Sequence, residues 1–326
     1  MPEAVSIERI SPDLSAEAVE IVVTLPTFRR PDHLLRTLQS LKAQGTRRRF
    51  AAIVIENDAE QGAGRRAADP LFASGEIAGL IITAHARGNC SAYNAGWTTA
   101  LERFPSMRYL AVIDDDETAG EDWLERLVGT AEALPVDIVG GPQVPVFEKE
   151  AGRSLARHPV FVPHYAASGP VPILFSSGNV LIRREVLETM GAPFLDTAFN
   201  FIGGGDSDFY SRCRERGFRF GWCAEAPVFE TTPPRRMEFS WLNARGMRNG
   251  ALSSIIERRR QGGRRGDLRR FAKSAALLAA SPFRSAALAA RTGSAIAGLY
   301  PMQVAIGRLL AEFGIVNEQY RRPDQN

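Results

Sequence analysis

An acidic triplet (DDD) occupies residues 114–116, directly after the apolar run at 110–113. A short apolar run that ends in turn-prone residues is typical of a buried strand. If the strand continues through the triplet, Asp114 and Asp116 point one way and Asp115 the other. Neighbouring buried carboxylates repel each other unless a cation lies between them. Hard oxygen ligands suit Mg²⁺ or Mn²⁺, completed by substrate phosphates; the alternative is a solvated acidic turn that leads into the helix at Trp123.

A second acidic site follows three glycines, in the segment GGGDSD at residues 203–208. Glycines let the backbone approach a ligand closely, and Asp206 would then act as a general base beside a pocket that a bulky side chain at 203–205 would block. The alternative is a plain N-cap, because a carboxylate is favoured at a helix N-terminus. Asp208 lies about 200° around the helix from Asp206, so we expect one of the two to face away from the pocket.

Arginines are candidates for binding phosphate. Arg245 and Arg248 share a helix face at a spacing of three residues, and guanidinium forks match phosphate oxygens well. Arginine is abundant throughout this chain, so a solvated surface is the alternative for any single one. The four histidines and three cysteines show no metal-ligand spacing, and the odd cysteine count argues against a disulfide framework.

The elements that must position these residues alternate between strand and helix. This alternation predicts an α/β fold with a mostly parallel central sheet, in which ligands bind beyond the carboxyl ends of the strands. Thr27, Asp58 and Asp114 fall at such ends. We predict strands over residues 20–25, 51–55, 80–83, 110–113, 138–140, 175–183, 218–222 and 227–230, and helices over 31–44, 91–104, 184–190, 206–216 and 240–260.

Six segments, in order over residues 20–250, resemble the family 2 glycosyltransferases, the inverting group with the GT-A (nucleotide-diphospho-sugar transferase) fold. The acidic triplet falls at the place of the family's D-x-D metal motif. Tyr93 stands where the A-R-N-x-G motif has arginine, and Gly205 where G-E-D-x-D-L has glutamate. The other segments are LPTFRRP at 25–31, the strand end END at 56–58, AYNAG at 92–96, SGNVLIRR at 177–184 and GGDSDF at 204–209.

The resemblance implies a role for each matching residue. Asp206 would be the catalytic base that takes the proton from the acceptor hydroxyl, and Asp116 would ligate Mn²⁺ or Mg²⁺ on the donor diphosphate. Glu230 stands where the family often has a histidine ligand, and a glutamate can serve a hard cation. The implied nucleotide-sugar-binding residues are Pro26, Thr27, Arg30, Asp58, Asn94, Asp114, Asp115, Arg245 and Arg248.

The segment from Glu230 through Arg248 resembles the branch that includes the succinoglycan glucosyltransferases, and the Q-x-x-R-W signature of processive synthases is absent. We therefore expect a hexose, with UDP-glucose as the expected donor, to be transferred to a glycan or lipid-linked acceptor of surface polysaccharide synthesis. Two alternatives are a non-catalytic sugar-nucleotide- or glycan-binding protein of the same fold and a nucleotidyltransferase, which also uses paired carboxylates and a divalent ion.

Composition adds bounds on the location and the partners. The 326 residues carry a net charge of only +3, which indicates no nucleic-acid partner. The few cysteines fit a reducing cytoplasm. We expect a loosely held leader over residues 1–19, a catalytic domain over 20–250 and a helical C-terminal region over 251–326.

The C-terminal region combines a run of basic residues at 258–273 with alanine-rich amphipathic segments. This combination favours peripheral contact with an anionic membrane, on its inner face. The alternative is a helical extension that packs on the catalytic domain or on a partner subunit, with a solvated charge run.

Overall fold

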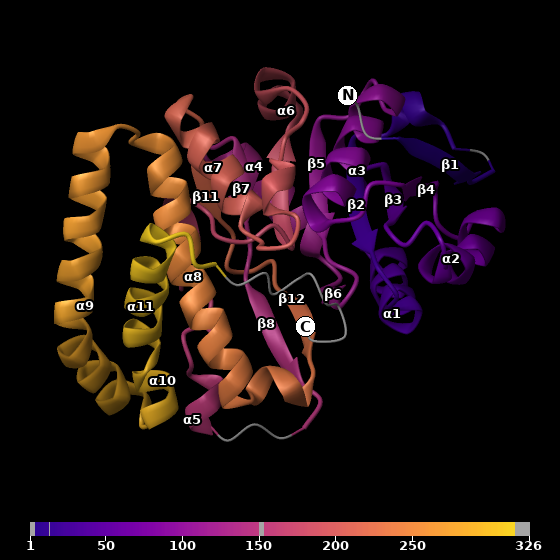
Figure 1. The fold of residues 1–326 in the computed structure, drawn as a ribbon. Helices are drawn as coiled ribbons and strands as arrows, with labels where there is room; N and C mark the ends of the chain where they lie inside the picture. Colours follow the sequence, from indigo (N-terminus) through magenta and orange to yellow (C-terminus); the bar gives the residue numbers. More distant parts are fainter. Residues whose placement is uncertain (1–3, 13, 150–152, 317–326) are drawn as a thin grey trace. The chain divides into compact units, whose positions relative to one another are not determined.

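The computed structural model describes residues 4–12, 14–149 and 153–316, and the chain forms two compact units (Figure 1). The first unit contains Met1–Val144, Pro163–Asn200 and Gly205–Glu230. The second contains Pro145–Val162, Phe201–Gly204 and Thr231–Asn326. The ends of the predicted leader and of the predicted C-terminal region, residues 1–3 and 317–326, lie outside the described residues, as does residue 13.

Four parallel strands form the centre of the first unit, in the order β4-β3-β2-β5. Their side chains are almost entirely buried, as expected for strands covered on both faces. The four predicted strands are confirmed, with bounds that differ from the predicted ones by one or two residues. They are β2 (Ile21–Thr27), β3 (Phe50–Glu56), β4 (Gly79–Ala84) and β5 (Tyr109–Ile113).

Antiparallel and parallel pairings extend this centre into a mixed nine-stranded sheet, in the order β1-β4-β3-β2-β5-β10-β7-β11-β9. The predicted strand from residue 175 begins only at residue 179, after the turn that contains Gly178. The added strands are β1 (Val5–Ile10), β7 (Ile138–Gly140), β9 (Gly169–Val171), β10 (Asn179–Arg183) and β11 (Phe220–Trp222).

Helices connect the strands of the first unit. In α1, Pro31 occupies the first position, and Leu34, Leu38 and Leu41 are fully buried in the core, as their helical spacing predicts. The helices of this unit are α1 (Pro31–Lys42), α2 (Ala63–Ala73), α3 (Asn89–Arg103), α4 (Trp123–Ala133), α6 (Arg184–Met190) and α7 (Gly205–Glu215), with short 3-10 turns at η1 (Ala16–Ala18) and η2 (Thr197–Phe199).

The prediction of a loosely held leader is wrong for β1. Val5–Ile10 pair antiparallel with β4, and Arg9 forms a two-bond ion pair with Asp69 on α2. The strand lies at the edge of the sheet and is only half-buried, so its sequence, VSIERI, lacks the apolar run that marks the central strands. Strand β1 is held in the sheet by backbone hydrogen bonds to β4, which do not require apolar side chains.

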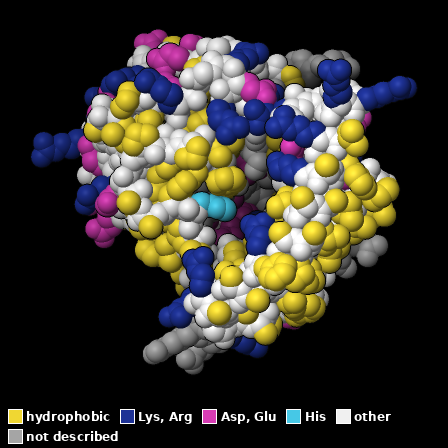
Figure 2. All heavy atoms as spheres, turned by 90° about the vertical axis from the view of Figure 1, so that its left-hand side faces the viewer, with side chains coloured by type: hydrophobic (Ala, Val, Ile, Leu, Met, Phe, Trp, Pro, Cys, Tyr) yellow, Lys and Arg dark blue, Asp and Glu magenta, His cyan; other side chains and the backbone are white. Residues whose placement is uncertain are grey.

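The second unit is mainly helical. Its long helices pack so closely that a Cβ on Gly250 would lie 2.0 Å from the carbonyl oxygen of Val304, and one on Gly307 would lie 1.9 Å from that of Met247. Figure 2 views the side on which α9 lies in Figure 1. The helices are α5 (Arg153–Ala156), η3 (Pro234–Met237), α8 (Phe239–Arg260), α9 (Arg264–Thr292), α10 (Ala295–Gly298) and α11 (Tyr300–Glu312).

A small three-stranded sheet has the order β6-β12-β8. It consists of β6 (Glu117–Ala119), β8 (Gln143–Phe147) and β12 (Val228–Thr232), and β6 follows the acidic triplet directly. The predicted strand at 227–230 is thereby confirmed as part of β12, and it carries Glu230 opposite Glu117.

Candidate active site

The acidic triplet lies in a tight turn between β5 and β6. Strand β5 ends at Ile113, so the predicted alternation of the three carboxylates along one strand is wrong. Asp115 and Asp116 both accept a hydrogen bond from Nη1 of Arg30, at 3.4 and 2.8 Å. A turn, unlike a strand, lets consecutive side chains converge on one partner, and Asp115 therefore does not point away from Asp116.

Asp115 connects the turn to the end of β2. Its carboxylate accepts a hydrogen bond from the hydroxyl of Thr27 at 2.8 Å and another from the backbone N–H of Phe28 at 3.4 Å. The Asp115 side chain is only 8% exposed, and burial raises its pKa to about 6, against the lowering effect of the Arg30 charge. Two residues of the predicted nucleotide site, Thr27 and Arg30, are thus brought to the triplet.

Asp114 faces a different set of partners, which the sequence did not indicate. The hydroxyl of Tyr93 donates a hydrogen bond to the Asp114 carboxylate, and the Ser177 hydroxyl lies 3.2 Å from that of Tyr93. Tyr93 therefore makes a neutral contact at the position where the motif has a cationic arginine. Burial raises the pKa of Asp114 to about 7, and the charge of Asp116 adds to the rise.

Glu117 completes the buried acidic cluster. It is fully buried, accepts the backbone N–H of Asp114 at 2.9 Å, and accepts a further hydrogen bond from the Gln143 side chain. Burial and the charge of Asp114 raise the pKa of Glu117 well above its usual range. Gly178 packs directly against this cluster. A Cβ there would lie 2.5 Å from the amide nitrogen of Gln143 and 2.7 Å from the Glu117 carboxylate, so no larger residue fits.

The carboxylates near the triplet are ligands of the type that a hard divalent cation prefers. Asp114, Asp116 and Glu117 are oxygen donors whose mutual repulsion a cation would relieve, and the charge of Glu230 raises the pKa of both Asp114 and Glu117. Within the described part of the chain, however, no three acidic, histidine or cysteine side chains come together closely enough to hold a metal. An ion at Asp116 would therefore depend on oxygens from the donor diphosphate and water, as is usual for Mg²⁺.

The raised pKa values predict how stability depends on pH. Because the pKa of Asp114 is about 7 and that of Asp115 about 6, the folded chain binds more protons than the unfolded chain between about pH 4 and 7. Without metal, this contribution to stability is present below about pH 4 and is lost as the pH rises to 7. We expect Mn²⁺ to raise the melting temperature more at pH 8 than at pH 5, because protons compete with the ion.

Thermal unfolding at both pH values, with Mn²⁺ or with a chelator, measures this difference. An equal shift at pH 5 and pH 8 would contradict an ion bound at these carboxylates.

Asp58, two residues beyond the end of β3, pairs with Arg29. The Arg29 side chain donates to the Asp58 carboxylate at 2.5 Å, and this bond lowers the pKa of Asp58 although burial opposes it. Arg29 has a φ of 57°, in the left-handed region that residues other than glycine rarely adopt. The guanidinium carbons of Arg29 and Arg87 lie 5.0 and 5.2 Å from the ring centre of Phe28. Phe28, Arg29 and Arg87 were not among the predicted site residues.

Asn94 and Pro26 are held within the fold. Asn94 is buried in α3, where its side-chain amide donates to the carbonyl of Leu195 and accepts the Leu195 backbone N–H, both at 2.8 Å. This pair joins α3 to the segment that precedes α7. Pro26 lies in β2 opposite Ile55 of β3.

Asp206 lies in the first turn of α7, one residue after the helix begins at Gly205. A Cβ on Gly205 would lie 2.5 Å from the sulfur of Cys90, so this glycine is required for packing against α3. The charges of Asp206 and Asp114 both raise the pKa of Tyr210, after the larger effect of burial. Asp206 and Asp114 therefore lie near the same buried tyrosine.

Asp208 faces a separate partner. It is buried and pairs with Arg212, one turn further along α7, at 2.9 Å. The expectation that one of Asp206 and Asp208 faces away from the pocket stays a prediction. Arg245 and Arg248 belong to the second unit, on α8, where the Arg245 guanidinium carbon lies 5.8 Å from the ring centre of Trp241 and Arg248 is buried.

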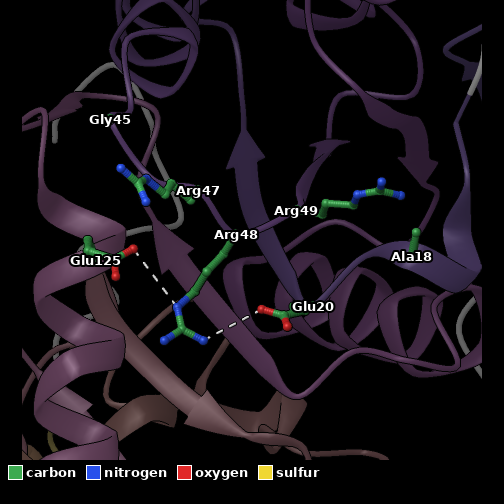
Figure 3. A pocket seen from close by; sticks show the side chains of 7 residues that line it. All are labelled: Ala18, Glu20, Gly45, Arg47, Arg48, Arg49 and Glu125. Atoms are coloured by element: carbon green, nitrogen blue, oxygen red, sulfur yellow. Dashed lines mark ion pairs between the residues drawn. The ribbon is translucent and has the colours of Figure 1, made fainter.

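A cavity of about 850 Å³ lies elsewhere in the first unit, at the amino ends of β2 and β3. Arg48 lies among its lining residues, and Glu20 and Glu125 form ion pairs with it (Figure 3). None of the predicted site residues lines this cavity. The carboxyl ends of the strands, where titratable side chains are buried together, are therefore the better candidate for the active site.

Comparisons with known sequences identify the family of the chain. A family model described as glycosyl transferase family 2 matches residues 22–191. The chain is 31% identical to the succinoglycan biosynthesis protein ExoM of Rhizobium meliloti over 251 residues, which are 72% of this chain and 74% of that protein. It is 24% identical to the glycosyltransferase AglE of Haloferax volcanii over 200 residues, 61% of this chain and 62% of that one.

Solved structures show the same fold at low sequence identity. The mannosyltransferase PcManGT of Pyrobaculum calidifontis, in complex with GDP-Man and Mn²⁺, has a TM-score of 0.55 at 17% identity, over 92% of this chain and 89% of that one. S. aureus TarS in complex with UDP has a TM-score of 0.51 at 11% identity, over 92% and 95%. The fold is GT-A, and the chain belongs to glycosyl transferase family 2.

Proposed function

We propose that this glycosyltransferase transfers a hexose from a nucleotide diphosphate sugar to a glycan or lipid-linked acceptor, by a metal-assisted single displacement that inverts the anomeric carbon. One observation carries the proposal. Two sets of carboxylates act on the same residue, Tyr210: the buried cluster after β5, through Asp114, and Asp206 on α7. The first can hold a cation and the second can accept a proton. An alcohol displacing a diphosphate needs both.

Each step falls to residues of the first unit. Asp206 takes the proton of the acceptor hydroxyl, the hydroxyl oxygen attacks the anomeric carbon, and the bond from that carbon to the diphosphate oxygen breaks. Mn²⁺ or Mg²⁺, when bound, neutralises the charge that develops on the diphosphate. Asp116 would hold the ion, with Glu230 as the proposed second ligand, and Asp114 would contact the ribose.

The nucleotide base would bind at the ends of β2 and β3. Thr27, Arg30 and Asp58 were assigned there from sequence, and the Phe28 ring with its two flanking guanidiniums offers a flat surface for stacking. The proposed donor is UDP-glucose, which the resemblance to succinoglycan glucosyltransferases supports. Arg245 and Arg248 stay proposed phosphate contacts.

The names of the similar proteins support the class of pathway. ExoM is named for succinoglycan biosynthesis, and we propose surface polysaccharide assembly for this chain as well. We propose a cytoplasmic location, on the inner face of the cell membrane, where a lipid-linked acceptor would be met. All three cysteines lie among the described residues, and none forms a disulfide, which supports a reducing compartment.

A donor panel tests the proposal. UDP-, GDP- and dTDP-sugars are incubated with the full chain and a glycan acceptor, with Mn²⁺ or with chelator, and nucleotide release is measured. We expect release with one UDP-hexose, dependent on both acceptor and Mn²⁺. Binding without release, for every donor, would favour a sugar-nucleotide-binding protein, and release of pyrophosphate from a nucleoside triphosphate would favour a nucleotidyltransferase.

A further inference from the structure

Helix α9 buries several polar side chains and exposes several large apolar ones. Its buried residues are Arg270, Ser274, Ser281 and Thr292. Several of its large apolar side chains are exposed instead, with Leu268 at 71%, Phe271 at 44% and Phe283 at 80%, while three leucines are half-buried. A surface helix of a water-soluble protein ordinarily has the opposite arrangement.

Nine of the exposed apolar residues form one continuous stripe, which we call the outer face of α9. They recur at intervals of three and four residues, with one adjacent pair at each of two turns, so they share one side of the helix. At 1.5 Å per residue the stripe is about 33 Å long. Its residues, all exposed, are Leu268, Ala272, Ala275, Ala276, Ala279, Phe283, Ala286, Ala287 and Ala290.

The inner side of α9 is fixed by ion pairs. Arg270 and Glu312 of α11 are 5% and 6% exposed and pair at 2.8 Å, and Ser274 lies 3.5 Å from the same carboxylate. Lys273 pairs with Glu257 of α8 at 3.0 Å. Rotating α9 to bury its apolar stripe would break these pairs and leave buried charges without partners, which is strongly unfavourable. The outward orientation is therefore the stable one.

Basic residues accompany the outer face. The segment 258–291 contains ten lysines and arginines and a single acid, Asp267, which pairs with Arg270. In Figure 2, a vertical band of hydrophobic side chains runs down the right-hand part of the view, with lysine and arginine side chains near its upper end. An apolar stripe beside cations complements a surface that is apolar inside and anionic outside.

We propose that the outer face of α9 docks on an anionic phospholipid bilayer, lying in the plane of the interface with Leu268 and Phe283 inserted and the neighbouring arginines at the headgroups. A symmetric contact between two copies fits less well, because it would bring the same cations together. Among the described residues, no helix is long and apolar enough to cross a bilayer. The proposal rests on the proposed function in one respect: docking would give the enzyme access to an acceptor held at the membrane.

The test is flotation of the full chain with vesicles of phosphatidylglycerol and phosphatidylethanolamine, against vesicles of phosphatidylcholine alone. We expect binding to the anionic vesicles only, weakened by high salt. The double variant Leu268→Gln/Phe283→Gln should lower the partition coefficient at least about tenfold, because it removes the two large side chains that insert into the bilayer. Both side chains are exposed, so their replacement should leave the fold intact. The matched control is Ile7→Gln/Ile10→Gln, two exposed apolar residues on β1, which should bind like the wild type.

Two outcomes would overturn the proposal. One is equal flotation of the double variant and the wild type. The other is a wild-type dimer in sedimentation that the double variant converts to monomer, since the outer face would then be an interface between copies. Nucleotide release with a soluble acceptor, measured on the same samples, separates the two proposals: if release persists without flotation, only the docking surface is wrong.

Discussion

Asp206→Asn is expected to lower the turnover number by about 10²–10⁴-fold, the range that general-base catalysis contributes. The amide has the shape of the carboxylate and can still accept the backbone N–H of Ser207, which lies 2.7 Å from the Asp206 oxygen. It cannot take the proton of an acceptor hydroxyl. The donor KM should change little, because the proposed role of Asp206 concerns the acceptor. Initial rates of nucleotide release at varied donor and acceptor concentrations measure both quantities.

The control for this variant is Glu215→Gln, which makes the same chemical change at the exposed end of the same helix. It should retain wild-type turnover. If turnover of Asp206→Asn is within threefold of that of the wild type, Asp206 is not the catalytic base. It would then be a carboxylate that only stabilises the start of α7.

Asp116→Asn is expected to reduce kcat/KM by roughly a hundredfold or more, because a metal ion supplies several kcal/mol of charge stabilisation in the transition state. The remaining activity should require a higher Mn²⁺ concentration. The side chain is almost buried and pairs with Arg30 at 2.8 Å, and asparagine keeps an oxygen available for that contact. The fold should therefore survive, which thermal unfolding checks alongside the Mn²⁺ titration of activity.

Asp122→Asn serves as the matched control, because Asp122 lies six residues further on with a side chain that is 66% exposed. Its rate and Mn²⁺ requirement should equal those of the wild type. If Asp116→Asn needs no more Mn²⁺ than the wild type, Asp116 is not a metal ligand.

The sequence predicted the central strands and the order of the site segments well, because each strand is a short apolar run followed by polar residues. It could not predict how the triplet is arranged. A strand that continued past Ile113 would separate Asp115 from Asp116, whereas the turn brings both to Arg30. Nor did it indicate Arg29 as the partner of Asp58, because the two residues are 29 positions apart and meet only in the folded chain.

Two further predictions differ from the structure for the same reason: the deciding contacts join residues that are far apart in the sequence. The edge strand β1 was predicted as a leader because its residues are only partly apolar, and its pairing with β4 is a backbone interaction. In α9, the helical spacing of apolar residues predicted an amphipathic segment but not which side is buried. That is decided by Glu312, more than 40 residues downstream of Arg270.

The contacts at Gly250 and Gly307 imply a sharp mutational boundary in the second unit. A methyl group at either position would meet a backbone carbonyl within about 2 Å, and backbone, unlike the tip of a long side chain, cannot move aside. Glycines 262, 263 and 293 have no such neighbour within 4 Å. In a library of random variants of this chain, alanine should therefore vanish from positions 250 and 307 under selection for a folded protein, while it persists at position 262.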